Sequence, residues 1–222
     1  MTQLLENIEI DTAPNPTVAV IWLHGLGADG NDFVPLVNEL DLSGLPGIRF
    51  VFPHAKTMPV TINGGYVMRA WYDITGAELT RREDEGGLRA SQRDVEALIA
   101  REKARGIPAS RIILAGFSQG CAMTLQTGMR HPEKLAGMLC LSGYLPLATA
   151  VAAERTEESL STPIFMAHGT HDNVVPFVRA QQSAQVLGEL GYQVEWHQYT
   201  MQHSLCLEEV QDISKWIRKV LA

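Results

Sequence analysis

A serine flanked by glycines lies where an apolar strand would turn into a helix. Residues 116–120 have the sequence Gly-Phe-Ser-Gln-Gly, with Ser118 at the centre. The apolar run at 112–114, with two β-branched isoleucines, predicts a buried strand before this motif, and residues 119 to about 130 predict a helix after it. Such a turn exposes a serine hydroxyl beside a helix N-terminus, which favours developing negative charge. Ser118 is therefore the candidate nucleophile; the alternative is a turn whose glycines serve packing alone.

A serine hydroxyl is a weak nucleophile unless a histidine takes its proton and an acid orients that histidine. Where a G-x-S-x-G turn carries the nucleophile, the chain order is Ser, then Asp or Glu, then His. Two aspartates follow Ser118, and the second, Asp212, has no histidine after it. Of the histidines after Asp172, His197 falls within a predicted strand, whereas His203 follows the last predicted strand. We therefore predict a catalytic triad of Ser118, Asp172 and His203.

Acyl transfer also needs hydrogen-bond donors for the oxygen that becomes negative in the transition state. The backbone N–H of Gln119 is the first candidate, because it belongs to the residue after the nucleophile. The second candidate is the N–H of Leu26, whose flanking glycines leave its backbone free to turn inward. The adjacent His24 could orient this backbone without a direct catalytic role. The alternative is that the glycines of residues 24–30 only make a tight turn.

These side chains need a sheet whose strand ends meet at one edge. Apolar runs predict strands at 18–23, 48–53, 112–114, 135–141, 163–167 and 194–199. Helical patterns lie between them, at about 32–39, 86–105, 119–130, 177–190 and 207–221. Alternating strands and helices predict an α/β fold with a mostly parallel sheet covered on both faces. Ligands of such sheets bind at the carboxyl ends of the strands, where all the candidate residues fall. We expect one domain, residues 1–222.

A long stretch at about 54–87 has no extended periodic pattern. Segments of this kind inside compact domains commonly carry function, and the aromatic residues here argue against disorder. We expect the stretch to cap the strand ends and to contact the substrate through Met68, Trp71 and Leu79. The alternative is a surface loop whose aromatic side chains pack into the core.

Composition excludes several classes of protein. The formal net charge of −7 and the absence of a basic run disfavour nucleic-acid partners and anionic membranes. No apolar run is long enough for stable membrane insertion, and the first residues lack a signal-peptide pattern, so we expect a cytoplasmic protein. Three cysteines in apolar surroundings are expected to be reduced thiols. No residue spacing indicates a metal site.

Four motifs in order resemble the acyl-protein thioesterase and carboxylesterase family. They are residues 23–27 (LHGLG), 116–120 (GFSQG), 169–176 (GTHDNVVP), and the positions Pro, Asn-Gly-Gly, Met and Trp-Tyr-Asp within residues 59–73. The resemblance spans nearly the whole chain. It implies an α/β-hydrolase fold, no cofactor, and hydrolysis of carboxylic esters or thioesters. The matching positions imply Ser118, Asp172 and His203 as the triad, with Leu26 and Gln119 at the oxyanion hole.

Two positions depart from the family pattern. Cys121 stands where the family usually has a second glycine, and residues 200–203 have no glycine before His203, with Gln202 at the adjacent position. We expect an ester or thioester substrate with a short-to-medium acyl chain, and a homodimer is compatible with the sequence. Alternatives are a lysophospholipase or peptidase on the same scaffold, or a non-catalytic ligand-binding protein.

Overall fold

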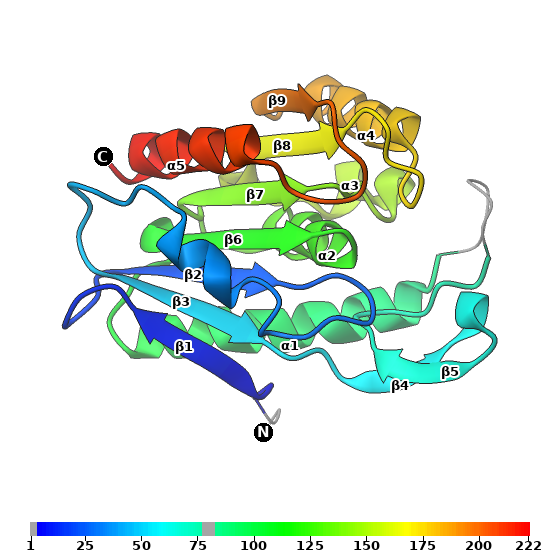
Figure 1. The fold of residues 1–222 in the computed structure, drawn as a ribbon, viewed down its shortest axis with the longest axis horizontal. Helices are drawn as coiled ribbons and strands as arrows, with labels where there is room; N and C mark the ends of the chain where they lie inside the picture. The colour runs from blue at the N-terminus through cyan, green and yellow to red at the C-terminus, as the bar shows by residue number, and fades with distance from the viewer. Residues whose placement is uncertain (1–3, 77–82) are drawn as a thin grey trace.

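A computed structural model describes residues 4–76 and 83–222 and has a seven-stranded sheet at its centre (Figure 1). The strand order is β1-β3-β2-β6-β7-β8-β9, and a separate pair, β4-β5, forms a small ribbon. Only β1 runs antiparallel to its neighbour among the seven strands of the described sheet; the other pairs are parallel. This arrangement confirms the predicted mostly parallel sheet of an α/β-hydrolase fold.

The bounds of the elements follow the apolar and amphipathic patterns of the chain. The sheet consists of β1 (Asn7–Asp11), β2 (Val18–Leu23), β3 (Ile48–Pro53), β6 (Ile112–Phe117), β7 (Gly137–Leu141), β8 (Ile164–Gly169) and β9 (Val194–Tyr199). The ribbon consists of β4 (Thr57–Val60) and β5 (Tyr66–Arg69). The helices are α1 (Glu85–Ala104), α2 (Gln119–Gly128), α3 (Ala148–Glu154), α4 (Phe177–Glu189) and α5 (Leu207–Leu221).

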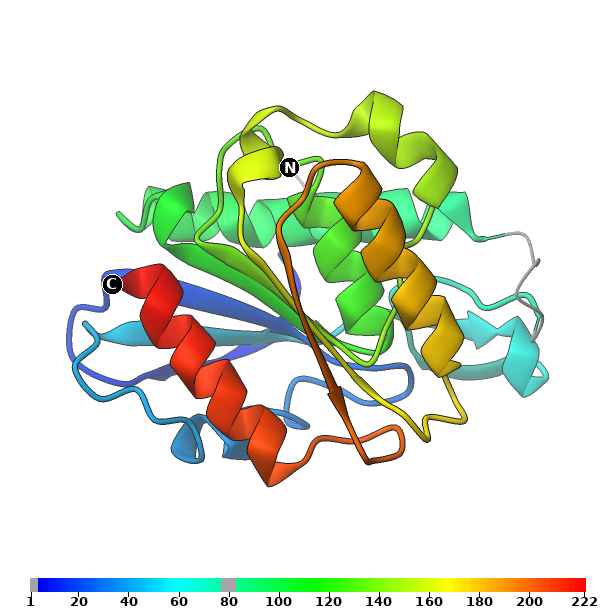
Figure 2. The same cartoon turned by 90° about the horizontal axis from the view of Figure 1, so that it is seen from above.

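Helices cover both faces of the sheet (Figure 2). On one face, α1 and α2 pack on the apolar side chains of β2 and β6, and α4 continues this layer over β8. On the other face, α5 buries Ile213, Trp216 and Ile217 against the strands. Alternate strand residues contribute to the two cores, as a pleated sheet requires. The loops that follow β2, β8 and β9, and the turn from β6 into α2, lie at the carboxyl ends of the parallel strands.

Three local predictions differ from the structure. The helix expected at 32–39 is a short 3₁₀-helix, Val34–Asn38. The stretch 54–87, expected to be irregular, contains the β4-β5 ribbon, whose antiparallel pairing runs from Thr57 opposite Arg69 to Val60 opposite Tyr66. The edge strand β1 was not predicted, because it alternates polar and apolar residues over only five positions and none of them is fully buried.

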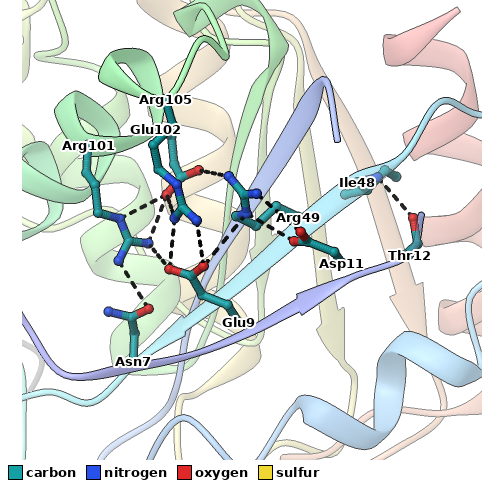
Figure 3. A network of polar contacts seen from close by, with 9 residues as sticks. All are labelled: Asn7, Glu9, Asp11, Thr12, Ile48, Arg49, Arg101, Glu102 and Arg105. Atoms are coloured by element: carbon teal, nitrogen blue, oxygen red, sulfur yellow. Dashed lines mark hydrogen bonds and ion pairs between the residues drawn. The ribbon is translucent and has the colours of Figure 1, made fainter. Parts of the chain in front are cut away.

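The unpredicted edge strand is held by a network of charged side chains (Figure 3). Glu102 of α1 is fully buried and lies 3.3 Å from the Arg49 guanidinium on β3. Glu9 of β1 pairs with Arg101 and Arg105, each at 2.9 Å. Glu102 is completely withdrawn from water, and its charge is compensated by the guanidinium groups of Arg49, Arg101 and Arg105. The network therefore ties β1 and β3 to the C-terminal end of α1, far from the candidate site.

Candidate active site

The chain makes a strained turn at Ser118, between β6 and α2. Ser118 has φ 57° and ψ −116°, a backbone conformation that residues with a side chain rarely adopt. The turn is possible because Gly116 and Gly120 have no side chains: a Cβ on Gly116 would lie 2.2 Å from the Gly120 carbonyl, and one on Gly120 would lie 2.0 Å from the Leu23 oxygen. Strain held in place by surrounding structure is typical of functional positions.

Cys121, which departs from the family pattern, fits because of the residue that faces it. A Cβ on Gly143 would lie 2.4 Å from the Cβ of Cys121, so the absence of a side chain at 143 makes room for the cysteine. Cys121 and Cys140 are both fully buried, and burial raises the pKa of the Cys140 thiol. These features fit the expected role of Cys121 as a small apolar residue of the core.

Asp172 and His203 meet above the ends of β8 and β9. The Oδ2 atom of Asp172 lies 2.7 Å from Nδ1 of His203, while Oδ1 accepts hydrogen bonds from the N–H groups of Val174 and Val175, each at 2.9 Å. His168 adds a contact from Nε2 to Oδ2 at 3.2 Å. Burial alone would raise the pKa of Asp172, but the bonds from His168, His203 and the two N–H groups outweigh it and lower that pKa. The carboxylate is therefore held ionised.

The loop that carries His203 packs tightly on the end of β8. A Cβ on Gly169 would lie 2.4 Å from the carbonyl oxygens of Met201 and Gln202, so glycine is needed on the strand instead of in the histidine loop. Among the described residues, the non-glycine positions with positive φ are Asn15, Ser118, Ser142 and Leu147, none of which lies in residues 200–203. Gln202 is thus compatible with an ordinary backbone conformation beside His203.

The imidazole of His203 lies beside the turn at Ser118. Its ring centroid is 4.7 Å from that of Phe117, the residue before the serine. The side chain of His203 is 15% exposed, and Ser118 is 9% exposed. The structure therefore brings all three predicted triad residues to one edge of the sheet, from loops after β6, β8 and β9.

The loop after β2 packs against Ser118. A Cβ on Gly25 would lie 3.4 Å from the Cβ of Ser118, which places the backbone around Leu26 close to the candidate nucleophile. Gln119 is the first residue of α2, so its N–H is among those without a partner inside the helix. Both predicted oxyanion donors thus belong to segments that flank Ser118.

His24 adopts one defined tautomer in this loop. Its Nε2 accepts a hydrogen bond from the Ala55 N–H at 3.0 Å, so Nδ1 carries the proton and donates to the Gly25 oxygen at 2.7 Å. Burial lowers the pKa of His24 to about 4, although its bond to Gly25 opposes that shift. The ring is neutral near neutral pH and fixes backbone, as the sequence suggested.

The three predicted substrate-binding residues have different positions. Met68 is half-buried on β5, and its Sδ lies 3.5 Å from the place that a Cβ on Gly27 would occupy. Trp71 is only 2% exposed, and its polar groups bond to other parts of the chain. Leu79 lies outside the described residues. The sequence did not single out Tyr66 or Val67, which are 70% and 60% exposed on the same ribbon.

His168 is the site residue whose role the sequence did not reveal. The signal in the sequence was its position at the end of a strand, four residues before Asp172.

Within residues 4–76 and 83–222, no group of three or more metal-ligating side chains is suitably placed to hold a metal ion. In the same part of the chain, none of the helices combines the length and apolar character that a membrane span requires.

Comparison with known proteins identifies the family. The model of the phospholipase/carboxylesterase family matches residues 6–221. The chain belongs to this family. An acyl-protein thioesterase 1 of Yarrowia lipolytica is 39% identical over 208 residues, which cover 91% of this chain and 92% of that protein. The acyl-protein thioesterase 1 of Neurospora crassa is 40% identical over 214 residues, covering 92% and 87%.

Solved structures agree with this assignment. The crystal structure of Arabidopsis thaliana SOBER1 superimposes with a TM-score of 0.88 at 33% identity, covering 92% of this chain and 99% of that one. Acyl-protein thioesterase 2 of Zea mays gives a TM-score of 0.84 at 27% identity, covering 97% and 99%. This member of the phospholipase/carboxylesterase family is an esterase or thioesterase of the serine hydrolase class.

Proposed function

We propose that this hydrolase cleaves esters or thioesters of short-to-medium acyl chains through a triad of Ser118, His203 and Asp172. The observation that carries the proposal is the contact of 2.7 Å between Asp172 Oδ2 and His203 Nδ1, beside the strained turn at Ser118. The relatives named acyl-protein thioesterase support an acylated substrate.

The hydrogen bond to Asp172 determines which nitrogen of His203 acts. A neutral His203 that donates from Nδ1 leaves the lone pair of Nε2 free to accept a proton. In the proposed reaction, Ser118 Oγ attacks the acyl carbon while its proton passes to Nε2. Collapse of the tetrahedral intermediate releases the alcohol or thiol, which takes that proton. Water then attacks the acyl-enzyme and gives a proton to Nε2. Collapse of this second intermediate returns that proton to Ser118 Oγ and releases the carboxylic acid.

The oxygen of the tetrahedral intermediate needs donors that are fixed before the reaction begins. We assign them as the backbone N–H groups of Leu26 and Gln119. The close approach of Gly25 to Ser118 and the position of Gln119 at the start of α2 support this assignment. Donors of this kind act mainly on kcat, because the negative charge exists only on the way to the intermediate.

The segment at about 54–87 is proposed to cap the site and to contact the acyl chain. Its ribbon follows β3 and presents the half-buried Met68 next to the loop of Leu26. Because side chains alternate along a strand, the exposed Tyr66 lies on the same face of the ribbon as Met68 and extends its apolar surface. A cytoplasmic location and a homodimer stay predictions of the sequence.

The test is trapping of the acyl-enzyme, with two matched histidine variants. Wild-type protein mixed with a chromogenic octanoyl ester should gain the mass of one acyl group on the peptide that contains Ser118, and Ser118→Ala should gain none. His203→Ala should lose nearly all turnover. His197→Ala should keep it, because His197 contacts Glu195 and Asp212, away from the serine. Turnover by folded Ser118→Ala close to that of the wild type would contradict the proposal.

A panel of substrates separates the alternatives. Acetyl, butyryl and octanoyl esters, the matching thioesters, a lysophospholipid and a peptide amide should be compared at equal enzyme concentration. The proposal expects the highest kcat/KM within the ester and thioester series. A lysophospholipid or peptide that is turned over faster than every simple ester would redirect the assignment while leaving the triad intact.

A further inference from the structure

Trp71 bonds to both segments that flank Ser118. Its indole Nε1–H donates to the carbonyl oxygen of His24 at 2.9 Å, and its backbone N–H donates to Oε1 of Gln119 at 3.0 Å. The side chain is 2% exposed, so little of it is available to a substrate. Trp71 therefore links the loop after β2 to the first residue of α2.

The side chain of Gln119 completes the link on the helix side. Its Nε2 donates to the carbonyl oxygen of Tyr72 at 2.7 Å, so the carboxamide bonds to the backbone of two successive residues. The hydroxyl of Ser91 on α1 donates to the Trp71 carbonyl oxygen and holds that backbone from the other side. Both polar atoms of the Gln119 carboxamide are therefore bonded, which anchors the first residue of α2 to residues 71 and 72.

The peptide groups on both sides of Leu26 are fixed as well. The Gly25 oxygen bonds to His24 Nδ1 at 2.7 Å, and the Gly27 N–H donates to the Arg69 oxygen at 2.9 Å. In a trans peptide the C=O and the N–H point in opposite directions. The Leu26 N–H therefore points away from the His24 ring. Residues 69–72 thus supply bonds to both halves of the proposed oxyanion hole.

We propose that Trp71 is a positioning residue that holds the Leu26 and Gln119 donors at the separation the tetrahedral intermediate requires. This inference rests on the proposed function, because it concerns the donors assigned there. It replaces the expected role of Trp71 as a substrate contact by a role exerted through His24 and Gln119. A residue of this kind stabilises the transition state more than the bound substrate.

The first variant is Trp71→Phe, which keeps an aromatic ring but removes the N–H that bonds to His24. Loss of one oxyanion donor costs about 10²- to 10³-fold in kcat, so displacement of a donor should cost less, about 10- to 100-fold. KM should stay within about threefold, because uniform binding is unchanged. Affinity for a trifluoromethyl ketone, which forms a tetrahedral adduct with serine, should fall by the same factor as kcat.

Trp22→Phe is the matched control. Trp22 lies on β2, two residues before His24, and is 1% exposed. In the part of the chain that the structure describes, its Nε1 is buried without a hydrogen-bond partner, so the substitution removes ring volume but no bond. We expect a lower unfolding temperature with kcat and inhibitor affinity close to the wild-type values.

Gln119→Met tests the other half of the link and decides the question if Trp71→Phe does not fold. This variant keeps the backbone N–H of residue 119 but loses both carboxamide bonds. We expect a fall in kcat and in inhibitor affinity similar to that of Trp71→Phe. The double variant should lose less than the product of the two single losses, because both substitutions break the same link.

The outcomes separate this inference from the proposed function. Wild-type kcat in folded Trp71→Phe, or an equal loss of kcat in Trp22→Phe, would overturn the positioning role while Ser118→Ala remained inactive. If Trp71→Phe cannot be purified folded, wild-type kcat in Gln119→Met would overturn it. Full turnover by Ser118→Ala would instead overturn the triad itself.

Discussion

His168 contacts the same carboxylate oxygen of Asp172 that bonds to His203. Its Nε2 lies 3.2 Å from Oδ2, and the Nδ1 of His203 lies 2.7 Å from that atom. The His168 ring is completely buried, and its Nε2 also lies 2.9 Å from the Val175 oxygen. The Nε2–H of His168 thus faces both Asp172 Oδ2 and the Val175 carbonyl oxygen. These contacts fix the turn after β8 and keep Asp172 in its charged form.

The first prediction concerns acid stability of His168→Phe. The pKa of Asp172 is lowered in the folded protein, so the ionised carboxylate stabilises the fold above its unfolded pKa of about 3.9. That stability is lost as the pH falls from there towards the folded pKa. Without the bond from His168 the folded pKa should rise, leaving less of this contribution at pH 5 to 6. Urea unfolding at about pH 6 and about pH 2 should therefore show a smaller difference in the variant.

His171→Phe is the control for this prediction, because His171 is exposed one residue before Asp172 and donates its backbone N–H to Met201. It should keep the wild-type dependence of the unfolding free energy on pH. An identical dependence in wild type and His168→Phe would refute the role assigned to His168.

Chain order and strand ends were sufficient to select three residues that the structure brings to one edge of the sheet, because the topology of a parallel sheet brings residues after β6, β8 and β9 together whatever their sequence separation. The role of His168 was not predictable in this way. It depends on the turn that brings residue 168 back onto residue 172, and this turn is set by the bonds of Asp172 to Val174 and Val175.

The environment of Trp71 shows a second limit. An aromatic residue in a stretch without periodicity can contact substrate or pack in the core, and its residue type does not distinguish the two. Its bonds to His24 and Gln119 join positions 47 and 48 residues away in the chain. The edge strand β1 was missed for a related reason, since its polar side chains find charged partners on β3 and α1 that are distant in the sequence.

The second prediction is that Ser118→Gly stabilises the protein while it abolishes activity. Ser118 has φ 57° and ψ −116°, and strain of this kind costs about 1–3 kcal/mol for a residue with a side chain. Glycine removes that strain, although part of the gain is offset by the greater freedom of glycine in the unfolded chain. The free energy of unfolding in urea should rise by about 1 kcal/mol.

Ser118→Ala is the matched variant, because it also lacks the hydroxyl but keeps the Cβ. Its kcat should fall by at least about 10³-fold, as for Ser118→Gly, while its stability stays near that of the wild type. A Ser118→Gly protein less stable than Ser118→Ala would show that the turn stores no strain at this residue.

The third prediction concerns Glu209, which is completely buried in the first turn of α5. Burial raises the pKa of this carboxyl to about 8. The folded state therefore holds a proton that the unfolded state loses above about pH 4.3, so stability should decline as the pH rises from there to about 8. Glu209→Gln should remove this decline and make the variant more stable than the wild type at about pH 9.

Glu208→Gln provides the comparison, because Glu208 is exposed one position earlier on the same helix. It removes one negative charge without changing a buried group. Thermal unfolding at about pH 5 and about pH 9 should separate Glu209→Gln from both the wild type and this control. Parallel pH profiles for all three proteins would mean that Glu209 does not hold a proton in the fold.

The last prediction concerns the acyl chain. Met68 of β5 lies beside Gly27, next to the proposed donor Leu26, so an acyl group bound there would extend past the Met68 side chain. Met68→Ala should lower kcat/KM for octanoyl esters about 10- to 100-fold more than for acetyl esters, the range for changes of fit in an apolar pocket.

Val67→Ala is the control and should not discriminate between acyl chain lengths, because successive residues of a strand point to opposite faces and Val67 is 60% exposed. Equal losses for acetyl, butyryl and octanoyl esters in Met68→Ala, with a lower unfolding temperature, would make Met68 a support of the ribbon instead of a wall of the acyl site. The same comparison applied to Leu79→Ala would test the third predicted substrate contact.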